Sequence, residues 1–331
     1  MRDRRSFLKT LAAATGGIMV PFSLVNGAIS IASDEFGELL PLRTLGATKE
    51  KVTMLGIGGA HIGRMDDNEA EKTINAAIEG GIRFFDNANQ YAGGAAEIRY
   101  GKYLVPKYRD VSFIMTKTAA KDGETARKHL ELSLKQMKTD YVDLWQVHAL
   151  RSPEDLETRI KNGVLDAFIE AKESGKARYI GFTGHNMFQS HQKMLELTDI
   201  MDTCQMPINC FDPNYKSYIN NVLPGLVDKN IGILAMKTLS NGGFFGGTRH
   251  HESGDNPRII PNIASIEEAL SFVWSLPVSV LITGPDNAEM LNEKIAIAKS
   301  FRKMSEKDRM ELVQRLGSAG LEGEKVEFYK T

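Results

Sequence analysis

Short apolar runs recur along the chain at a nearly regular spacing. They cover residues 52–58, 83–88, 112–117, 142–148, 177–183, 204–209, 232–237 and 279–284. Each run is almost continuously apolar, as expected for parallel strands that are covered on both faces. The pattern therefore predicts eight buried strands.

Amphipathic stretches separate these runs and predict helices. "NEAEKTINAAIEGG" places Ala70, Ile74 and Ala77 on one stripe and ends in a glycine pair, which is a helix stop. "ETARKHLELSLKQMKTD" has the same kind of apolar stripe. In "SIEEALSFVWSL", Ser265 is followed three residues later by Glu268, which indicates a capping box.

The alternation of strand and helix repeats about every 30 residues, eight times. It predicts an α/β fold, a single-domain (β/α)8 TIM barrel over residues 33–331 that ends in a C-terminal helix. The doubly wound alternative would need a glycine-rich fingerprint after the first strand, but "GIGGAHIG" lacks the third glycine at the right spacing. Residues 33–51 form a polar lead-in, and residues 321–331 extend toward the pocket or solvent.

The first residues predict an export signal rather than part of the fold. "MRDRRSFLK" contains the pair Arg4-Arg5 followed by Phe7, Leu8 and Lys9, which matches the twin-arginine pattern. The apolar stretch after it, residues 11–25, is shorter than the ~20 residues of a spanning helix. We expect a signal over residues 1–32, with cleavage or retention as an anchor left open. The protein would then meet the twin-arginine export machinery and reach the periplasm or the outer face of the cytoplasmic membrane.

Composition narrows the classes of function. The 331 residues are 42% hydrophobic and 25% charged, with a formal net charge of −1, so the sequence offers no basic surface for nucleic acid. The two cysteines, Cys204 and Cys210, lie in one apolar run and are expected to be buried thiols. No cluster of cysteine and histidine has the spacing of a metal site, so no metal is predicted.

Polar residues follow three adjacent strands at the end where a TIM barrel carries its active site. Asp86 ends the second run with Tyr91 in its loop, Lys117 ends the third and His148 ends the fourth. A lysine ammonium beside a tyrosine lowers the phenol pKa, and an aspartate keeps that lysine charged. A histidine can orient a substrate oxygen. These four residues predict a proton donor for a carbonyl oxygen that receives a hydride.

With these residues in place, the sequence resembles the aldo-keto reductase superfamily, and specifically a bacterial branch with a twin-arginine signal. The motifs that carry the resemblance are "FFDNANQY", "MTK", "DYVDLWQVH", "GKARYIGFTGH", "LAMKTLSNGG" and "VLITGPDNAEML". The resemblance implies that Asp86, Tyr91, Lys117 and His148 are the catalytic tetrad. Related members carry a C-terminal cysteine cluster, which this chain lacks, so no iron–sulfur cluster is expected.

The resemblance also implies a nicotinamide cofactor lying across the barrel mouth, because side chains cannot supply a hydride. Thr183 would lie near the carboxamide, with Gln205 and Asn209 beside it. The "ITGPDN" loop would hold the adenosine phosphate end at a helix N-terminus. The expected cofactor-binding residues are Gly58, Gly59, Thr183, Gln205, Met236, Lys237, Leu239, Gly243, Gly284, Asp286 and Asn287.

The sequence leaves NAD and NADP open. Members of the superfamily often hold the 2′-phosphate of NADP with a basic residue where this chain has Asp286, and a carboxylate there favours NAD. Arg249 or Arg258 could take over the phosphate. If the protein is exported, we expect it to carry the cofactor tightly bound.

The predicted function is NAD(P)-dependent hydride transfer on a small carbonyl or alcohol substrate. Two alternatives stay open. One is a nucleotide-binding sensor or accessory subunit of the same fold without significant turnover. The other is a barrel enzyme without a redox cofactor. The physiological substrate and the oligomeric state do not follow from the sequence.

Overall fold

The eight predicted strands close into a barrel. The structure is a computed structural model and describes residues 32–247 and 259–331. The strands follow one another around the barrel in chain order, and each neighbouring pair is parallel. They are β5 (Leu55–Gly58), β6 (Phe84–Asp86), β7 (Phe113–Thr118), β8 (Val142–Leu150), β9 (Ala177–Gly184), β10 (Thr203–Pro207), β11 (Gly232–Met236) and β12 (Val280–Thr283). The predicted (β/α)8 barrel is confirmed.

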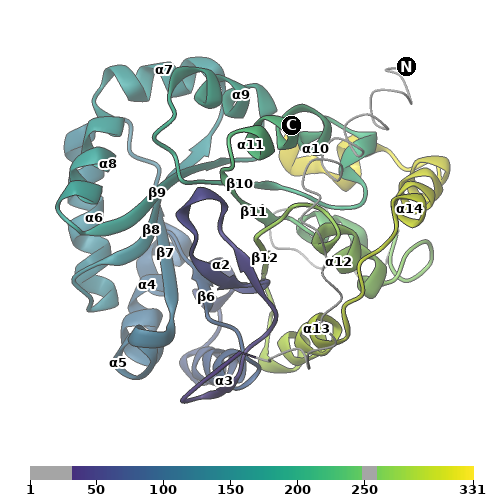
Figure 1. The fold of residues 1–331 in the computed structure, drawn as a ribbon, viewed down its shortest axis with the longest axis horizontal. Helices are drawn as coiled ribbons and strands as arrows, with labels where there is room; N and C mark the ends of the chain where they lie inside the picture. The colour runs from purple at the N-terminus through teal and green to yellow at the C-terminus, as the bar shows by residue number, and fades with distance from the viewer. Residues whose placement is uncertain (1–31, 248–258) are drawn as a thin grey trace, which may run out of the picture.

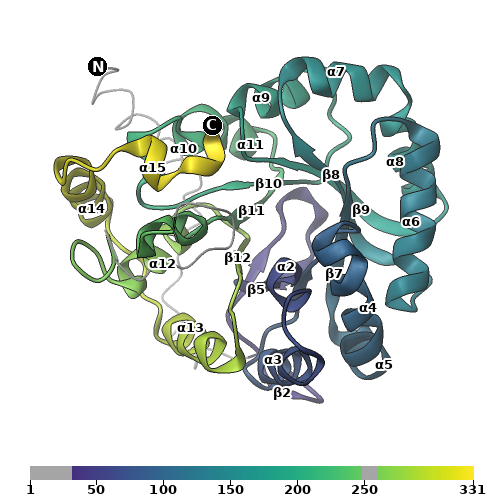
Figure 2. The ribbon, with the colours of Figure 1, turned by 180° about the vertical axis from the view of Figure 1, so that it is seen from behind.

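Helices surround the strands on the outside of the barrel (Figures 1 and 2). The longer ones are α3 (Asp67–Glu79), α6 (Gly123–Met137), α7 (Pro153–Lys161), α8 (Val164–Glu173), α9 (Phe188–Leu197), α12 (Ile266–Trp274) and α13 (Ala288–Ser300). Shorter helices are α2 (Gly59–Ile62), α4 (Ala95–Arg99), α5 (Val105–Tyr108), α10 (Tyr218–Asn221) and α11 (Leu223–Asp228). The predicted capping box of α12 is present, since Ser265 and Glu268 each accept from the other's backbone N–H.

The apolar residues form two layers. Inside the barrel, Phe84 stacks on Phe113 and Phe113 on Tyr179, with ring centroids 4.9 and 6.4 Å apart. Between strands and helices lies a larger layer, in which Trp145 of β8 stacks on Phe168 of α8. These layers hold the strand ends in fixed positions, and those strand ends carry the polar residues of interest.

The first predicted strand is too long at its start. Residues 51–53 belong to β4 (Lys51–Thr53), which pairs with β3 (Leu42–Thr44) in an antiparallel hairpin. Met54 lies between β4 and β5, and its backbone carbonyl accepts from the Trp274 indole and from Leu281 N–H. The hairpin lies across the amino-terminal end of the barrel, where Figure 1 shows it in purple. A second small hairpin, β1 (Ser33–Asp34) with β2 (Gly37–Glu38), precedes it.

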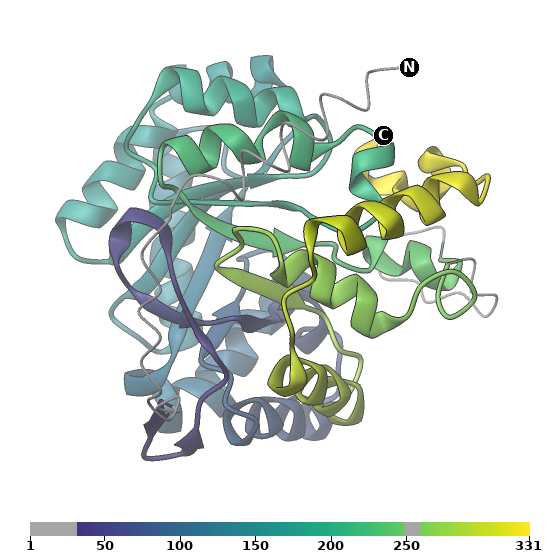
Figure 3. The ribbon, with the colours of Figure 1, turned by 45° about the vertical axis from the view of Figure 1, so that its right-hand side comes forward.

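The C-terminal segment packs onto the barrel. Helix α14 (Glu306–Ser318), the predicted final helix, lies along its side (Figure 3). It is followed by α15 (Gly323–Val326) and the 3-10 turn η7 (Phe328–Lys330), which Figure 2 shows near α10. Tyr329 and Lys330 are buried. Of the two directions expected for residues 321–331, the segment leaves solvent and packs beside the cavity, where the Tyr329 carbonyl is 2.9 Å from Nδ1 of the cavity-lining His185.

Several expectations from the sequence fall on residues 1–31 and 248–258, outside the described residues. They are the twin-arginine signal and the two arginines Arg249 and Arg258. Cys204 and Cys210 are buried and unbonded, as predicted. Among the helices of residues 32–247 and 259–331, none is both long and apolar enough to cross a membrane.

Candidate active site

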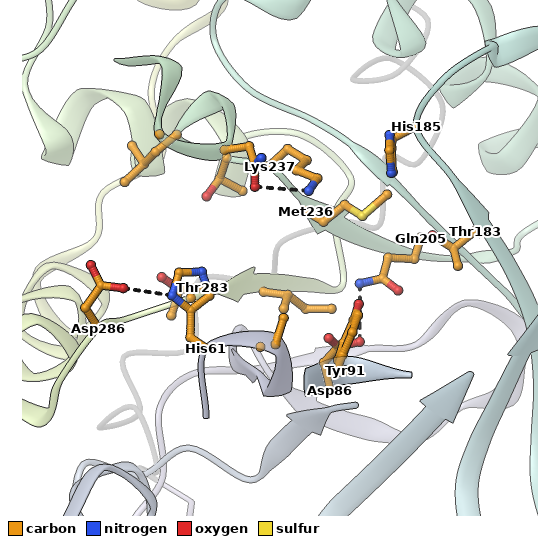
Figure 4. A pocket seen from close by; sticks show the side chains of 18 of the residues that line it. His61, Asp86, Tyr91, Thr183, His185, Gln205, Met236, Lys237, Thr283 and Asp286 are labelled. Atoms are coloured by element: carbon orange, nitrogen blue, oxygen red, sulfur yellow. Dashed lines mark hydrogen bonds and ion pairs between the residues drawn. The ribbon is translucent and has the colours of Figure 1, made fainter. Parts of the chain in front are cut away.

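A cavity of about 350 Å³ opens at the carboxyl ends of the strands. The four predicted catalytic residues line it, as do eight of the eleven predicted cofactor residues (Gly58, Thr183, Gln205, Met236, Lys237, Leu239, Gly284 and Asp286). Figure 4 shows Asp86, Tyr91 and Gln205 close together in one part of the cavity, with His61 and Asp286 in another. Parallel strands bring these side chains together because all of the strands end at the same rim.

Lys117 connects three groups at the floor of the cavity. Its Nζ donates to Asp86 Oδ1, to the Asn87 carbonyl at 2.7 Å and to Tyr91 Oη at 3.2 Å. An ammonium has three N–H bonds, so all three are used. Burial lowers the pKa of Lys117, but Asp86 and Tyr91 outweigh burial and raise it above its usual range. Lys117 is therefore held as a cation beneath the tyrosine oxygen.

Asp86 is fixed from several sides. Its carboxylate also accepts from Gln205 Nε2 at 3.4 Å, and its backbone carbonyl accepts from the buried Tyr100 hydroxyl at 3.1 Å. Burial raises the pKa of Asp86, and Lys117 offsets part of that rise. The Asp86 carboxylate is thus a buried partner for Lys117, and it lies too deep to cap a helix or turn at the surface.

Tyr91 lies at the start of a strained turn. It begins the 3-10 turn η2 (Tyr91–Gly94), in which Ala92 has φ 50°, a value that a side chain disfavours. Lys117 donates to the Tyr91 oxygen, so the Tyr91 O–H is directed elsewhere, and the described residues contain no other partner for it. The Tyr91 hydroxyl is therefore placed to donate its proton to a ligand in the cavity.

The expected lowering of the Tyr91 pKa is wrong as a net effect. Burial raises the pKa of Tyr91 above its usual value of about 10, and Asp86 adds to the rise. Lys117 does lower it, as the sequence indicated, but by less than burial raises it. Tyr91 is accordingly protonated at neutral pH, which suits a proton donor.

His148 is uncharged at the wall of the cavity. Burial lowers its pKa well below its usual value, and the nearby cations, Lys117 first among them, lower it further. Its ring meets the Tyr91 ring edge to face, with centroids 5.6 Å apart, and its Nδ1 is buried without a hydrogen bond to the described residues. A neutral imidazole here can donate one N–H to a ligand oxygen without bringing a charge.

Thr183 and Gln205 lie side by side on neighbouring strands, because β9 and β10 pair them in register. Gln205 uses its amide nitrogen on Asp86, while its Oε1 is buried without a partner among the described residues. An orphaned carbonyl oxygen next to a threonine hydroxyl fits the amide of a nicotinamide ring. The residues present therefore fit such a cofactor.

Asn209 does not take part in that group. Its amide nitrogen donates to Glu327 at 2.7 Å and to the Tyr329 hydroxyl at 3.0 Å, both in the C-terminal segment. Its Oδ1 accepts from the backbone N–H of Phe211 and Asp212. Asn209 thus anchors residues 321–331 instead of facing the cavity.

Three predicted cofactor residues do not line the cavity. A Cβ on Gly59 would lie 2.5 Å from the Asp86 carbonyl, and one on Gly243 would lie 2.2 Å from the Val326 carbonyl. Both glycines therefore serve the packing of the chain against itself. Asn287 is the N-cap of α13, where its side chain accepts from Met290 N–H at 2.9 Å.

The sequence missed several residues that line the cavity, among them His61, His185 and Lys294. His61 lies in helix α2, where its Nδ1 is 3.0 Å from Asp286 Oδ1. His185 follows β9, and its Nδ1 is 2.9 Å from the Tyr329 carbonyl. Their positions depend on loops and on the C-terminal segment, which periodicity does not place. For Lys294 a signal existed, since it falls on the apolar stripe of its helix.

Comparison with known proteins agrees with this geometry. The aldo/keto reductase family model matches residues 54–306. The oxidoreductase YqkF of Bacillus subtilis is 25% identical over 293 residues, which cover 78% of this chain and 92% of that protein. L-galactose dehydrogenase of Arabidopsis thaliana is 29% identical over 227 residues, 61% of this chain and 66% of that protein.

Solved structures show the same fold. The aldo-keto reductase AKR11C1 from Bacillus halodurans, in its holo form, superposes with a TM-score of 0.71 at 18% identity, over 87% of this chain and all of that chain (100%). An aldo-keto reductase from Klebsiella pneumoniae in complex with NADPH has a TM-score of 0.65 at 18% identity, over 83% of this chain and 94% of that chain. With the family model spanning most of the barrel, the chain belongs to the aldo/keto reductase family and is an NAD(P)-dependent oxidoreductase.

Proposed function

We propose that this protein transfers a hydride between a nicotinamide cofactor and a small carbonyl or alcohol substrate, with Tyr91 as the general acid or base. The observation that carries the proposal is the bonding of Lys117. Its Nζ donates to Asp86, to the Asn87 carbonyl and to Tyr91 Oη. The tyrosine oxygen accepts this bond, so its own proton is free for a ligand oxygen in the cavity.

The chain's residues supply the proton and its control. In the reducing direction, the Tyr91 O–H donates its proton to the carbonyl oxygen as the carbonyl carbon gains the hydride, and the C=O becomes CH–OH. Lys117 stabilises the phenolate left behind, and Asp86 balances the lysine charge. The neutral His148 ring donates an N–H to the same oxygen and orients it. In the reverse direction the phenolate takes the proton back.

The cofactor, when bound, supplies or accepts the hydride. Thr183 and Gln205 are proposed to hold the nicotinamide amide, with Met236 and Gly58 beside the ring. Lys237 and Leu239 would lie along the pyrophosphate, and Gly284 and Asp286 would lie near the adenosine. The NADPH bound to the Klebsiella pneumoniae structure and the dehydrogenase among the relatives support a nicotinamide cofactor.

The test is the Tyr91→Phe variant, with Tyr141→Phe at the other end of the barrel as the matched control. NADPH and NADH oxidation would be followed with a panel of aldehydes, ketones and sugars, and nucleotide binding by fluorescence. We expect Tyr91→Phe to lower kcat by about 10²–10⁴-fold, with nucleotide affinity nearly unchanged. Retained turnover in Tyr91→Phe would refute its acid role. A wild type that binds nucleotide but reduces no substrate would favour the sensor alternative.

We also propose that the protein is exported by the twin-arginine route with its nucleotide already bound. The sequence "DRRSFLK" and the apolar stretch behind it support this. Twin-arginine export moves folded proteins, and free nicotinamide nucleotides are not expected outside the cytoplasm. A preloaded nucleotide would then cycle between an oxidised and a reduced substrate.

A further inference from the structure

Lys294 is a buried cation on the wall of the cavity. It lies on α13, on the same face as Leu291, Ile295 and Ala298, and only 6% of the residue is exposed. It lines the cavity together with Asp286 and Met290. Among the residues that the structure describes, its Nζ makes no hydrogen bond and no ion pair. A lysine in this position occupies a place that the helix otherwise gives to apolar residues.

An unpaired ammonium in such a place is costly to the fold, because it loses its hydration without gaining a partner. Burial lowers the pKa of Lys294 to about 8, against the raising effects of Asp286 and Glu293. By contrast, Lys299 on the same helix is exposed to solvent. The cost at Lys294 is balanced if an anionic group of a ligand lies beside the ammonium.

Two backbone N–H groups at the N-terminus of α13 are already bonded within the chain. The N–H of Ala288 donates to Glu69 Oε1 at 2.8 Å, and the N–H of Met290 donates to the Asn287 side chain at 2.9 Å. The helix N-terminus that the sequence predicted as the phosphate site therefore already bonds to side chains of the chain. With these two groups engaged, a side-chain cation is the stronger partner for a phosphate at this end of the cavity, and Lys294 provides one.

The Asp286 carboxylate repels a bound phosphate less strongly than the sequence indicated. Its side chain is 55% exposed, and its Oδ1 lies 3.0 Å from His61 Nδ1. Glu293 is also exposed. Charges in contact with water are screened several-fold more than charges in a buried site. The buried ammonium therefore outweighs the two exposed carboxylates for a ligand that enters the cavity.

The position of Lys294 indicates which part of the ligand it meets. Hydride transfer requires the nicotinamide near Tyr91 and His148, and Figure 4 shows Asp286 and His61 well away from Tyr91 in the same cavity. An extended dinucleotide then has its adenosine ribose near Lys294. We propose that Lys294 binds the phosphate on the adenosine ribose and makes the protein prefer NADP(H) to NAD(H). This inference rests on the proposed hydride transfer with a nicotinamide cofactor.

The experiment is direct binding to the full chain after any copurified nucleotide has been removed. Dissociation constants would be measured by calorimetry for NADPH, NADH, 2′,5′-ADP and 5′-AMP, with the wild type, Lys294→Met, Lys294→Arg and the exposed control Lys299→Met. We expect the wild type to prefer the 2′-phosphorylated member of each pair. Lys294→Met should weaken NADPH and 2′,5′-ADP by about 10- to 100-fold and leave NADH and 5′-AMP within about twofold. Lys294→Arg should keep most of the preference.

The outcomes separate this inference from the proposed function. A wild type that binds NADH as tightly as NADPH, or more tightly, would overturn the role of Lys294 while leaving hydride transfer intact. Equal losses for both members of a pair in Lys294→Met would also overturn it, because that result indicates a structural effect. If neither dinucleotide binds the wild type, the proposed function itself fails. If Lys294→Met does not fold, the same measurements on Lys294→Gln, together with the ratio of the wild type's dissociation constants for NADH and NADPH, decide the question.

Discussion

Three buried lysines, Lys117, Lys294 and Lys330, and the half-buried Lys237 show that a lysine's partner decides whether its charge is kept. Burial lowers the pKa of each, yet Lys117 and Lys330, which touch carboxylates, have raised pKa values. Lys237 and Lys294, which no carboxylate within residues 32–247 and 259–331 contacts at bonding distance, have pKa values lowered to about 8. Lys237 instead donates to Asn241 Oδ1 at 3.1 Å. Lys117 and Lys330 are thus held as cations by carboxylates of the chain itself, whereas Lys237 and Lys294 line the cavity at places where an anionic group of a ligand can pair with them.

Removing the charge of Lys117 should affect stability as well as turnover. In Lys117→Met the buried Asp86 carboxylate loses its cation, which costs about 3–5 kcal/mol of the free energy of unfolding. Urea unfolding at pH 7.5 measures this. The control is Lys128→Met, which breaks the exposed pair with Glu124 and should leave the unfolding midpoint in place. A Lys117→Met midpoint equal to that of the wild type would contradict a buried ion pair at the floor of the site.

His191 should make stability fall in mild acid. Its ring lies between Phe182 and Tyr218, with centroids 5.4 and 5.1 Å away, and burial lowers its pKa from 6.5 to about 4. Below pH 6.5 the unfolded chain binds a proton that the folded chain does not, so stability decreases as the pH falls toward 4. The slope is about 1.4 kcal/mol per pH unit for one such group.

The measurement is the free energy of unfolding at pH 7.5, 6.0 and 5.0 for the wild type and His191→Leu. The variant should lose that part of the pH dependence, whatever its stability at pH 7.5. An unchanged slope in His191→Leu would show that the ring is protonated in the folded protein, against its burial among aromatic rings.

The repeating strands and helices could be predicted from the sequence. The segments whose positions depend on contacts with residues far away in the chain could not. The strand ends follow from local apolar runs, so Asp86, Lys117 and His148 could be placed at one rim from the sequence. The caps of α12 and α13 are local as well, and Asn287, which the sequence offered as a cofactor residue, has its side chain engaged as the cap of α13. The place of residues 321–331 was not predictable, since it rests on groups about 120 residues away in the chain.

That C-terminal segment is held by a buried cluster of charges. Lys330 Nζ donates to Asp212 Oδ1 and Glu327 Oε2, each at 2.6 Å, and to the Tyr215 carbonyl at 2.9 Å. All three charged side chains are fully buried. The segment also contacts a residue that lines the cavity, since the Tyr329 carbonyl is 2.9 Å from His185 Nδ1. The cluster thus links the chain end to the wall of the active site.

Lys330→Met should therefore destabilise the protein by about 3–5 kcal/mol, because two buried carboxylates lose their cation. Thermal or urea unfolding measures the loss, and adding Glu327→Gln should recover part of it. Lys325→Met, which breaks the exposed pair with Glu322 in the same segment, is the matched control and should change little. If Lys330→Met unfolds like Lys325→Met, the cluster does not hold the segment.

The two ends of the barrel differ across the molecule. The hairpin of β3 and β4 lies across the amino-terminal end, and Leu45 and Val52 join the core inside the barrel. The cavity opens at the other end, between β12 and the segments that follow β9 and β11. A ligand in this cavity meets side chains contributed by strands all around the barrel.

Export by the twin-arginine route would involve the whole chain, with its nucleotide already bound. In a bacterial host with a twin-arginine pathway, the wild type should reach the periplasm with about one nucleotide per protein, identified by mass after denaturation. Replacing both Arg4 and Arg5 with lysine should keep the protein inside the cell, because the pathway reads the arginine pair, whereas the control Arg2→Lys should be exported normally. Export of the double-lysine variant would refute the signal. Exported wild type without nucleotide would refute preloading alone, since the cavity could still bind a nucleotide added afterwards.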